Sequence, residues 1–190
     1  MKPMNCIILS VVILSLFAAC AAPAEYPTAD NLFAYAVRAE GDDLEPAWAD
    51  FGTSPDEVKS RLPWGETAKQ RDEGEETWLY REYTIESGKV RVTESVGFCQ
   101  GQFRIVLIEL QIPEALMDSF CERVFRGAET VMPSTLLYME DAPLTNYRWG
   151  DRKGDSAAFV EDRYGAPEGQ KVLTLCVQCF PDRLRSLTTK

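Results

Sequence analysis

Two apolar-rich stretches of equal length, separated by a two-residue turn signal, constrain this chain most. Residues 89–99 and 102–112 alternate like β-strands, and Gln100-Gly101 between them suits a tight hairpin loop. With that loop Phe98 faces Phe103 and Val96 faces Ile105. The buried face is then expected to hold Val90, Val92, Val96, Phe98, Phe103, Ile105 and Leu107.

Helix signals precede and follow this hairpin. Ser54-Pro55-Asp56-Glu57 predicts a helix start with a capping box, and Pro63 ends that helix. Pro113 begins a second helix, whose apolar stripe is expected to cover the sheet and contains Leu116, Phe120 and Val124, with Met117, Cys121 and Phe125 beside it.

Further strands complete the pattern. They are predicted at residues 78–85, 145–149, 156–160 and 171–180. The chain therefore predicts an α+β fold with an antiparallel sheet built from two helix-plus-three-strand halves, with the helices packed on one face. Residues 29–190 are expected to form a single domain, with room for an internal duplication.

The first residues have the layout of an export signal. Lys2 is followed by an apolar run over residues 6–17, which is shorter than the ~20 residues of a spanning helix. Leu16-Phe17-Ala18-Ala19-Cys20 resembles the lipobox of bacterial lipoproteins, although Phe17 stands where that family usually has Leu, Val or Ile. The resemblance implies a signal peptide over 1–19 and palmitate-type acylation of Cys20.

The residues after the signal bear on where the exported chain is located. Residues 20–28 are mostly small and contain two prolines, which suits a tether. By the family's sorting habit, Ala21 after the lipidated cysteine implies an outer membrane and a chain facing the periplasm. The alternative is cleavage after Ala24 and a soluble secreted protein.

Charge and composition exclude several functions. The 190 residues include 20 basic and 30 acidic side chains, for a net charge of -10, so nucleic-acid binding is not expected. No histidine is present, which removes the commonest general base and metal ligand. No phosphate-binding, dinucleotide or nucleophile-elbow motif occurs, so we expect no enzyme, cofactor or metal site.

A short segment suggests a family for the scaffold. Residues 51–59, Phe-Gly-Thr-Ser-Pro-Asp-Glu-Val-Lys, followed by a meander, resemble small envelope lipoproteins of the SmpA/OmlA type. The resemblance covers about a third of the chain and implies helices on a three-stranded sheet and a role in outer-membrane protein assembly. The chain departs from that pattern in having one helix before the meander and a second set of strands.

Four cysteines remain after Cys6 and Cys20. An even number in an exported chain predicts disulfides, and strand sidedness favours Cys121 with Cys179 and Cys99 with Cys176. Cys176-Val177-Gln178-Cys179 also has the spacing of a thiol-disulfide oxidoreductase or a zinc site. However, cysteines three apart on a strand point to opposite faces, ~10 Å apart, which disfavours both alternatives.

Two segments are expected to be loops. Residues 70–76 form a charge run typical of a solvated loop. Residues 133–144 form a long apolar connection in which Leu137 and Tyr138 either plug the sheet edge or join Tyr147 and Trp149 in a patch that binds a partner.

The sequence thus favours a non-catalytic, membrane-anchored envelope lipoprotein that binds a protein or wall partner. The alternatives are a periplasmic thiol-disulfide oxidoreductase using the Cys176–Cys179 motif, and a carrier for an apolar ligand.

Overall fold

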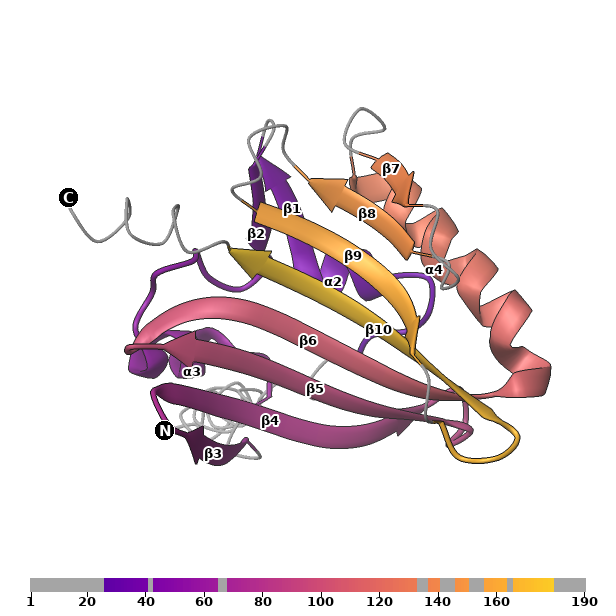
Figure 1. Ribbon diagram of the computed structural model, residues 1–190, viewed down its shortest axis with the longest axis horizontal. Coiled ribbons are helices and arrows are strands. Elements are labelled where there is room, and N and C mark those ends of the chain that lie inside the picture. Colours follow the sequence, from indigo (N-terminus) through magenta and orange to yellow (C-terminus); the bar gives the residue numbers. More distant parts are fainter. Residues whose placement is uncertain are drawn as a thin grey trace, which may run out of the picture.

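The computed structural model describes residues 26–40, 43–64, 68–132, 137–140, 146–150, 156–163 and 166–179. It contains an eight-stranded antiparallel sheet in the order β3-β4-β5-β6-β10-β9-β8-β7 and a separate two-stranded sheet, β1-β2 (Figure 1). The predicted α+β class with an antiparallel sheet is confirmed. The strands of the large sheet are β3 (Lys69–Glu73), β4 (Glu76–Ile85), β5 (Val90–Cys99), β6 (Gln102–Pro113), β7 (Leu137–Glu140), β8 (Asn146–Gly150), β9 (Ser156–Arg163) and β10 (Gln170–Cys179).

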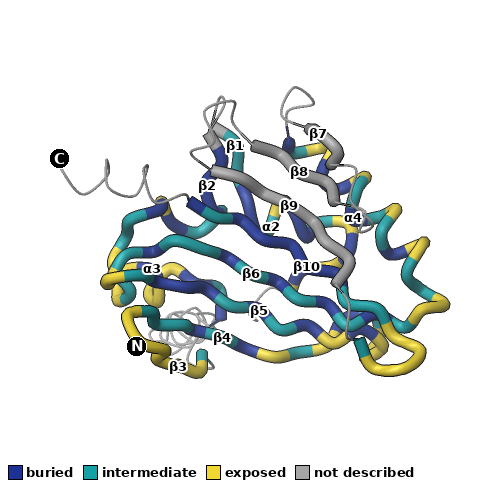
Figure 2. Tube along the Cα trace, viewed as in Figure 1, coloured by how far each residue is buried: buried dark blue, intermediate teal, exposed yellow. Residues whose placement is uncertain are grey.

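The remaining elements form a second layer on one side of this sheet, which we call the inner side (Figure 1). They are α2 (Leu32–Ala36), β1 (Val37–Glu40), β2 (Asp43–Pro46), α3 (Pro55–Arg61), the 3-10 turn η2 (Glu114–Leu116) and α4 (Met117–Val131). The buried core lies between the two layers (Figure 2). No helix in the described ranges is long and apolar enough to cross a membrane.

The central hairpin forms as predicted, but its register changes once. Gln100 and Gly101 have φ values of 51° and 74°, which the tight turn requires. Phe98 pairs with Phe103, whereas Gly97 pairs with Ile105, so Arg104 is the extra residue of a β-bulge.

The bulge overturns two of the seven predicted buried positions, Ile105 and Leu107, whereas the other five are buried. Beyond it Val96 pairs with Val106, not with Ile105. Ile105 and Leu107 therefore lie on the outer side of the sheet and stay half-buried. The inward, fully buried positions of β6 are Phe103, Val106, Ile108, Leu110 and Ile112.

Both predicted helices are present: α3 begins at Pro55 after Ser54, as predicted, whereas the second helix starts later than predicted. Phe120 and Val124 of α4 are buried as expected, but the α-helix begins at Met117 after the 3-10 turn. At α3 the Val58 amide donates to the Ser54 carbonyl over 3.0 Å. The capping box is wrong, since Ser54 makes no side-chain cap bond and the Glu57 carboxylate pairs with Arg61 instead.

The two predicted helices, α3 and α4, each precede four strands of the large sheet, not three. The additional strands are the two edges, β3 and β7. The charge run predicted as a loop forms most of β3, and the long connection contains β7, so both loop predictions were partly wrong.

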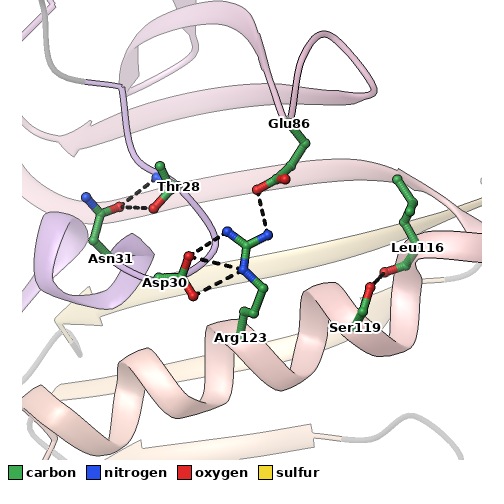
Figure 3. Close-up of polar contacts among 7 residues, drawn as sticks. All are labelled: Thr28, Asp30, Asn31, Glu86, Leu116, Ser119 and Arg123. Carbon is green, nitrogen blue, oxygen red and sulfur yellow. Dashed lines mark hydrogen bonds and ion pairs between the residues drawn. The ribbon is translucent and has the colours of Figure 1, made fainter.

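A salt-bridge cluster fixes the start of the described chain (Figure 3). Arg123 of α4 donates from Nε to both carboxylate oxygens of Asp30, each over 3.1 Å, and from Nη1 to Glu86 over 3.0 Å. The hydrogen bond from Arg123 holds the pKa of Asp30 below its usual range. Gly127 is needed here, because a Cβ atom would lie 2.3 Å from the Asp30 carbonyl oxygen.

Candidate functional site

The outer side of the large sheet carries a stripe of half-buried apolar side chains. Trp78 and Ile105 pair with Gly97 from either side, and Tyr80 and Leu107 pair with Ser95 in the same way. All four large side chains are partly exposed. We call Trp78, Tyr80, Ile105 and Leu107 the outer stripe. No described helix lies over it (Figure 1).

Gly97 creates a hollow at one end of the stripe. A Cβ atom there would lie 2.6 Å from Ile105 Cγ2 and 2.8 Å from Trp78 Cζ3, so only glycine lets these side chains converge over the strand. The hollow has a volume of about 140 Å³. Its lining is completed by Glu76, Phe98, Cys99, Arg104 and Gln178.

Polar groups frame the hollow and the stripe. Trp78 Nε1 donates to Glu76 Oε2 over 3.2 Å, which orients the indole. Lys69 lies 5.6 Å from the centre of the Tyr80 ring and pairs with Glu82 over 3.2 Å. Apolar and aromatic groups therefore occupy the middle of this face, with charges at its border, as in protein interfaces.

A second polar site lies on the inner side, and sequence reasoning missed it. Arg81 of β4 and Glu94 of β5 are directly opposite, 4% and 0% exposed, with Arg81 Nε donating to Glu94 over 2.8 Å. Arg81 Nη2 also contacts the Tyr35 hydroxyl at 2.7 Å, and the Tyr83 hydroxyl donates to Glu94 over 3.3 Å.

Aromatic rings enclose this pair. The guanidinium carbon of Arg81 lies 4.7 to 5.3 Å from the ring centres of Tyr26, Trp64 and Tyr83. Burial raises the pKa of Glu94, opposed by Arg81, and burial also raises the pKa of Tyr83. The cluster joins Tyr26, near the start of the described chain, to β4 and β5, so we assign it a structural role.

The structure does not bring the predicted cysteine pairs together. Cys99 and Cys176 both face outward as predicted, but β6 separates their strands, which places them at least two strand spacings, about 10 Å, apart. This exceeds the ~7 Å limit for a disulfide. No disulfide joins the cysteines in the described ranges.

The other predicted pair is also separated. Cys179 is inward-facing and buried at the end of β10, nine residues from Gln170 and thus ~30 Å along the strand. Cys121 lies near the start of α4, and α4 begins at the Gln170 end of β10, because the Glu114 amide donates to the Gly169 carbonyl over 3.0 Å. Cys176 and Cys179 lie in a strand, as predicted, and not at a helix start.

For the remaining predicted site residues the structure describes only the backbone or nothing. Leu137 in β7 pairs with Trp149 in β8, and Tyr138 is the next residue of β7. Their side chains, like the whole of Cys20, lie outside the described residues. The outer stripe could have been predicted only if the position of the β-bulge at Arg104 were known, because the bulge turns Ile105 and Leu107 to the outer side.

Comparison with known proteins identifies no relative: no protein family, no curated protein and no solved structure matches this chain.

Proposed function

We propose that this chain is a non-catalytic bacterial envelope lipoprotein that binds a partner protein through the outer stripe. One observation carries the proposal: a sheet face bearing Trp78, Tyr80, Ile105 and Leu107 has no described helix over it. Aromatic residues are enriched in the buried centres of protein interfaces.

The size of the hollow favours a protein partner over a small apolar ligand. Pockets for drug-sized ligands measure ~300 to 1,000 Å³, whereas the hollow beside Gly97 measures about 140 Å³. That volume suits a single anchoring side chain. Glu76 and Arg104 on its lining offer both charge signs to the polar groups around such an anchor.

The membrane anchor remains part of the proposal. Acylation of Cys20 would attach the chain to the outer membrane, facing the periplasm, while secretion after cleavage at Ala24 is the alternative. Two or three acyl chains, at ~0.8 kcal/mol per buried methylene, would make the attachment permanent. A partner in the envelope is therefore expected.

We also propose that the sheet arose by internal duplication. A helix and four strands, α3 to β6, precede a helix and four strands, α4 to β10. The last strands of the two groups, β6 and β10, are antiparallel neighbours at the middle of the sheet. The proposal of a role in outer-membrane assembly rests only on the resemblance to SmpA/OmlA-type lipoproteins.

Photo-crosslinking in the native envelope tests the binding face. A photoreactive residue in place of Leu107 should give a discrete protein adduct, and the same residue in place of the exposed Ala115 should not. Ile105→Glu should abolish the adduct while circular dichroism shows a folded chain. Equal adducts from both positions, or none from Leu107, would contradict the proposed binding face.

A further inference from the structure

A polar hollow lies at the opposite end of the sheet from Gly97. Its volume is about 280 Å³, and it lies among the β4–β5 turn, β6 and the start of β10. The lining residues are Thr84, Gly88, Lys89, Arg91, Gln111, Pro167 and Gln170. Two cations and three neutral hydrogen-bonding side chains line it, and no carboxylate of the described residues does.

The two cations of this hollow belong to the minority of described basic side chains that form no ion pair. Most basic side chains in the described ranges form ion pairs, including Arg61, Lys69, Arg71 and Arg126. No ion pair within those ranges involves Lys89 or Arg91, although the whole chain has a net charge of -10. Glu114 and Glu168 lie near this end of the sheet, but neither lines the hollow.

The tether keeps this end within reach of a membrane. Tyr26 packs on Tyr83, with ring centres 4.6 Å apart, and Asp30 is fixed to Arg123 and through it to Glu86 in the β4–β5 turn. Six residue steps separate Cys20 from Tyr26, and they span at most ~20 Å. A lipid on Cys20 would therefore hold the turn that carries Lys89 close to the headgroups.

The two ends of the sheet differ in charge. The β3–β4 turn, about 30 Å away along β4, carries the exposed or half-exposed carboxylates Asp72, Glu73, Glu75 and Glu76. An anionic membrane surface repels that end and attracts unpaired cations. We propose that the hollow around Lys89 and Arg91 binds the phosphate of a membrane lipid headgroup and turns this end of the sheet toward the bilayer; this inference rests on the proposed lipid anchor.

The test uses the mature, lipidated chain in phosphatidylglycerol-containing vesicles. A photoreactive residue in place of Thr84, at the edge of the hollow that it lines, should give lipid adducts, and one in place of Glu75, in the β3–β4 turn, should give few. Lys89→Gln with Arg91→Gln should lower the Thr84-to-Glu75 adduct ratio by up to about thirtyfold, from ~1 kcal/mol per cation near an anionic surface.

The matched control removes two cations from α3, Lys59→Gln with Arg61→Gln. This helix begins beside Phe103, at the far end of β6, since Phe103 and Thr53 share a 2.9 Å backbone bond. The control should keep the adduct ratio of the parent. A ratio that falls equally in both double variants would overturn the inference.

Two further measurements separate the inference from the anchor. In vesicles of a phosphate-free galactolipid the preference for Thr84 should disappear, and an undiminished preference there would overturn phosphate recognition. Mass spectrometry of the vesicle-bound chain reports acylation of Cys20. An unacylated Cys20 would overturn the anchor and the inference together, whereas equal adducts from both ends of an acylated chain would overturn the inference alone.

Discussion

Replacing Arg81 with alanine should lower the free energy of unfolding by about 3 to 5 kcal/mol. Glu94, which is 0% exposed, would keep its carboxylate in the interior without the cation that lies 2.8 Å from it. The three aromatic rings around the guanidinium would also lose their contacts. A domain of this size is stable by ~5 to 15 kcal/mol, so the variant should fold but melt much earlier.

Urea unfolding followed by circular dichroism measures this loss. Arg126→Ala is the matched control, because Arg126 pairs with Glu122 on the surface, 66% and 72% exposed, and such pairs contribute at most ~0.5 kcal/mol. Arg81→Met combined with Glu94→Leu should restore much of the loss, since it leaves no buried charge. If Arg81→Ala costs no more than Arg126→Ala, the buried pair is not a fixed part of the core.

The pH dependence of the same pair gives an independent check. Burial raises the pKa of Glu94 in the folded chain. A raised carboxyl pKa contributes stability that is complete below the unfolded value and is lost as the pH rises through the folded value. The unfolding free energy of the parent should therefore fall relative to Glu94→Gln as the pH rises above 4.5. A difference that grows in the parent's favour would contradict the assigned direction.

Three further predictions follow from other contacts. Cys20→Ala should move the protein from the membrane to the soluble fraction, and persistent membrane association would refute the lipid anchor. Gly127→Ala should cost about 1 to 3 kcal/mol in thermal unfolding, because the new Cβ meets the Asp30 backbone, and an unchanged melting temperature would refute that close approach. Arg123 lowers the pKa of Asp30, so the ionised carboxylate contributes to stability above pH 3.8, and this contribution is lost as the pH falls through the pKa of Asp30 in the folded chain. In urea unfolding, Asp30→Asn should therefore lose less stability than the parent on acidification.

The hairpin was predictable because its local signals agree. Alternation over residues 89–99 and the Gln100-Gly101 turn specify two strands and the sharp reversal between them. Its register was not predictable beyond the turn. Residues 105–108, Ile-Val-Leu-Ile, are apolar at every position, so either set of alternate residues could face the core. The bulge at Arg104 decides between them through tertiary packing, and with it the identity of the outer stripe.

The buried ion pair was hidden for a different reason. Arg81 and Glu94 are charged residues in separate strands, and each alone is expected to face water. Only the pairing of β4 with β5 places them opposite each other at inward positions. Once that register is known, the alternation of β4 gives the signal, because Arg81 lies between the inward residues Leu79 and Tyr83.

The charge run also belongs to the sheet, and this bears on how a partner can bind. Every residue of β3, Lys69 to Glu73, is exposed, yet the strand pairs along its whole length with β4. Charged side chains on an edge strand discourage pairing with another chain. At the other edge, β7 has the sequence Leu-Tyr-Met-Glu, with one charge in four residues. Extension of the sheet by a partner strand is therefore disfavoured at β3, so the part of the sheet that carries the outer stripe is available through its face and not through its nearer edge.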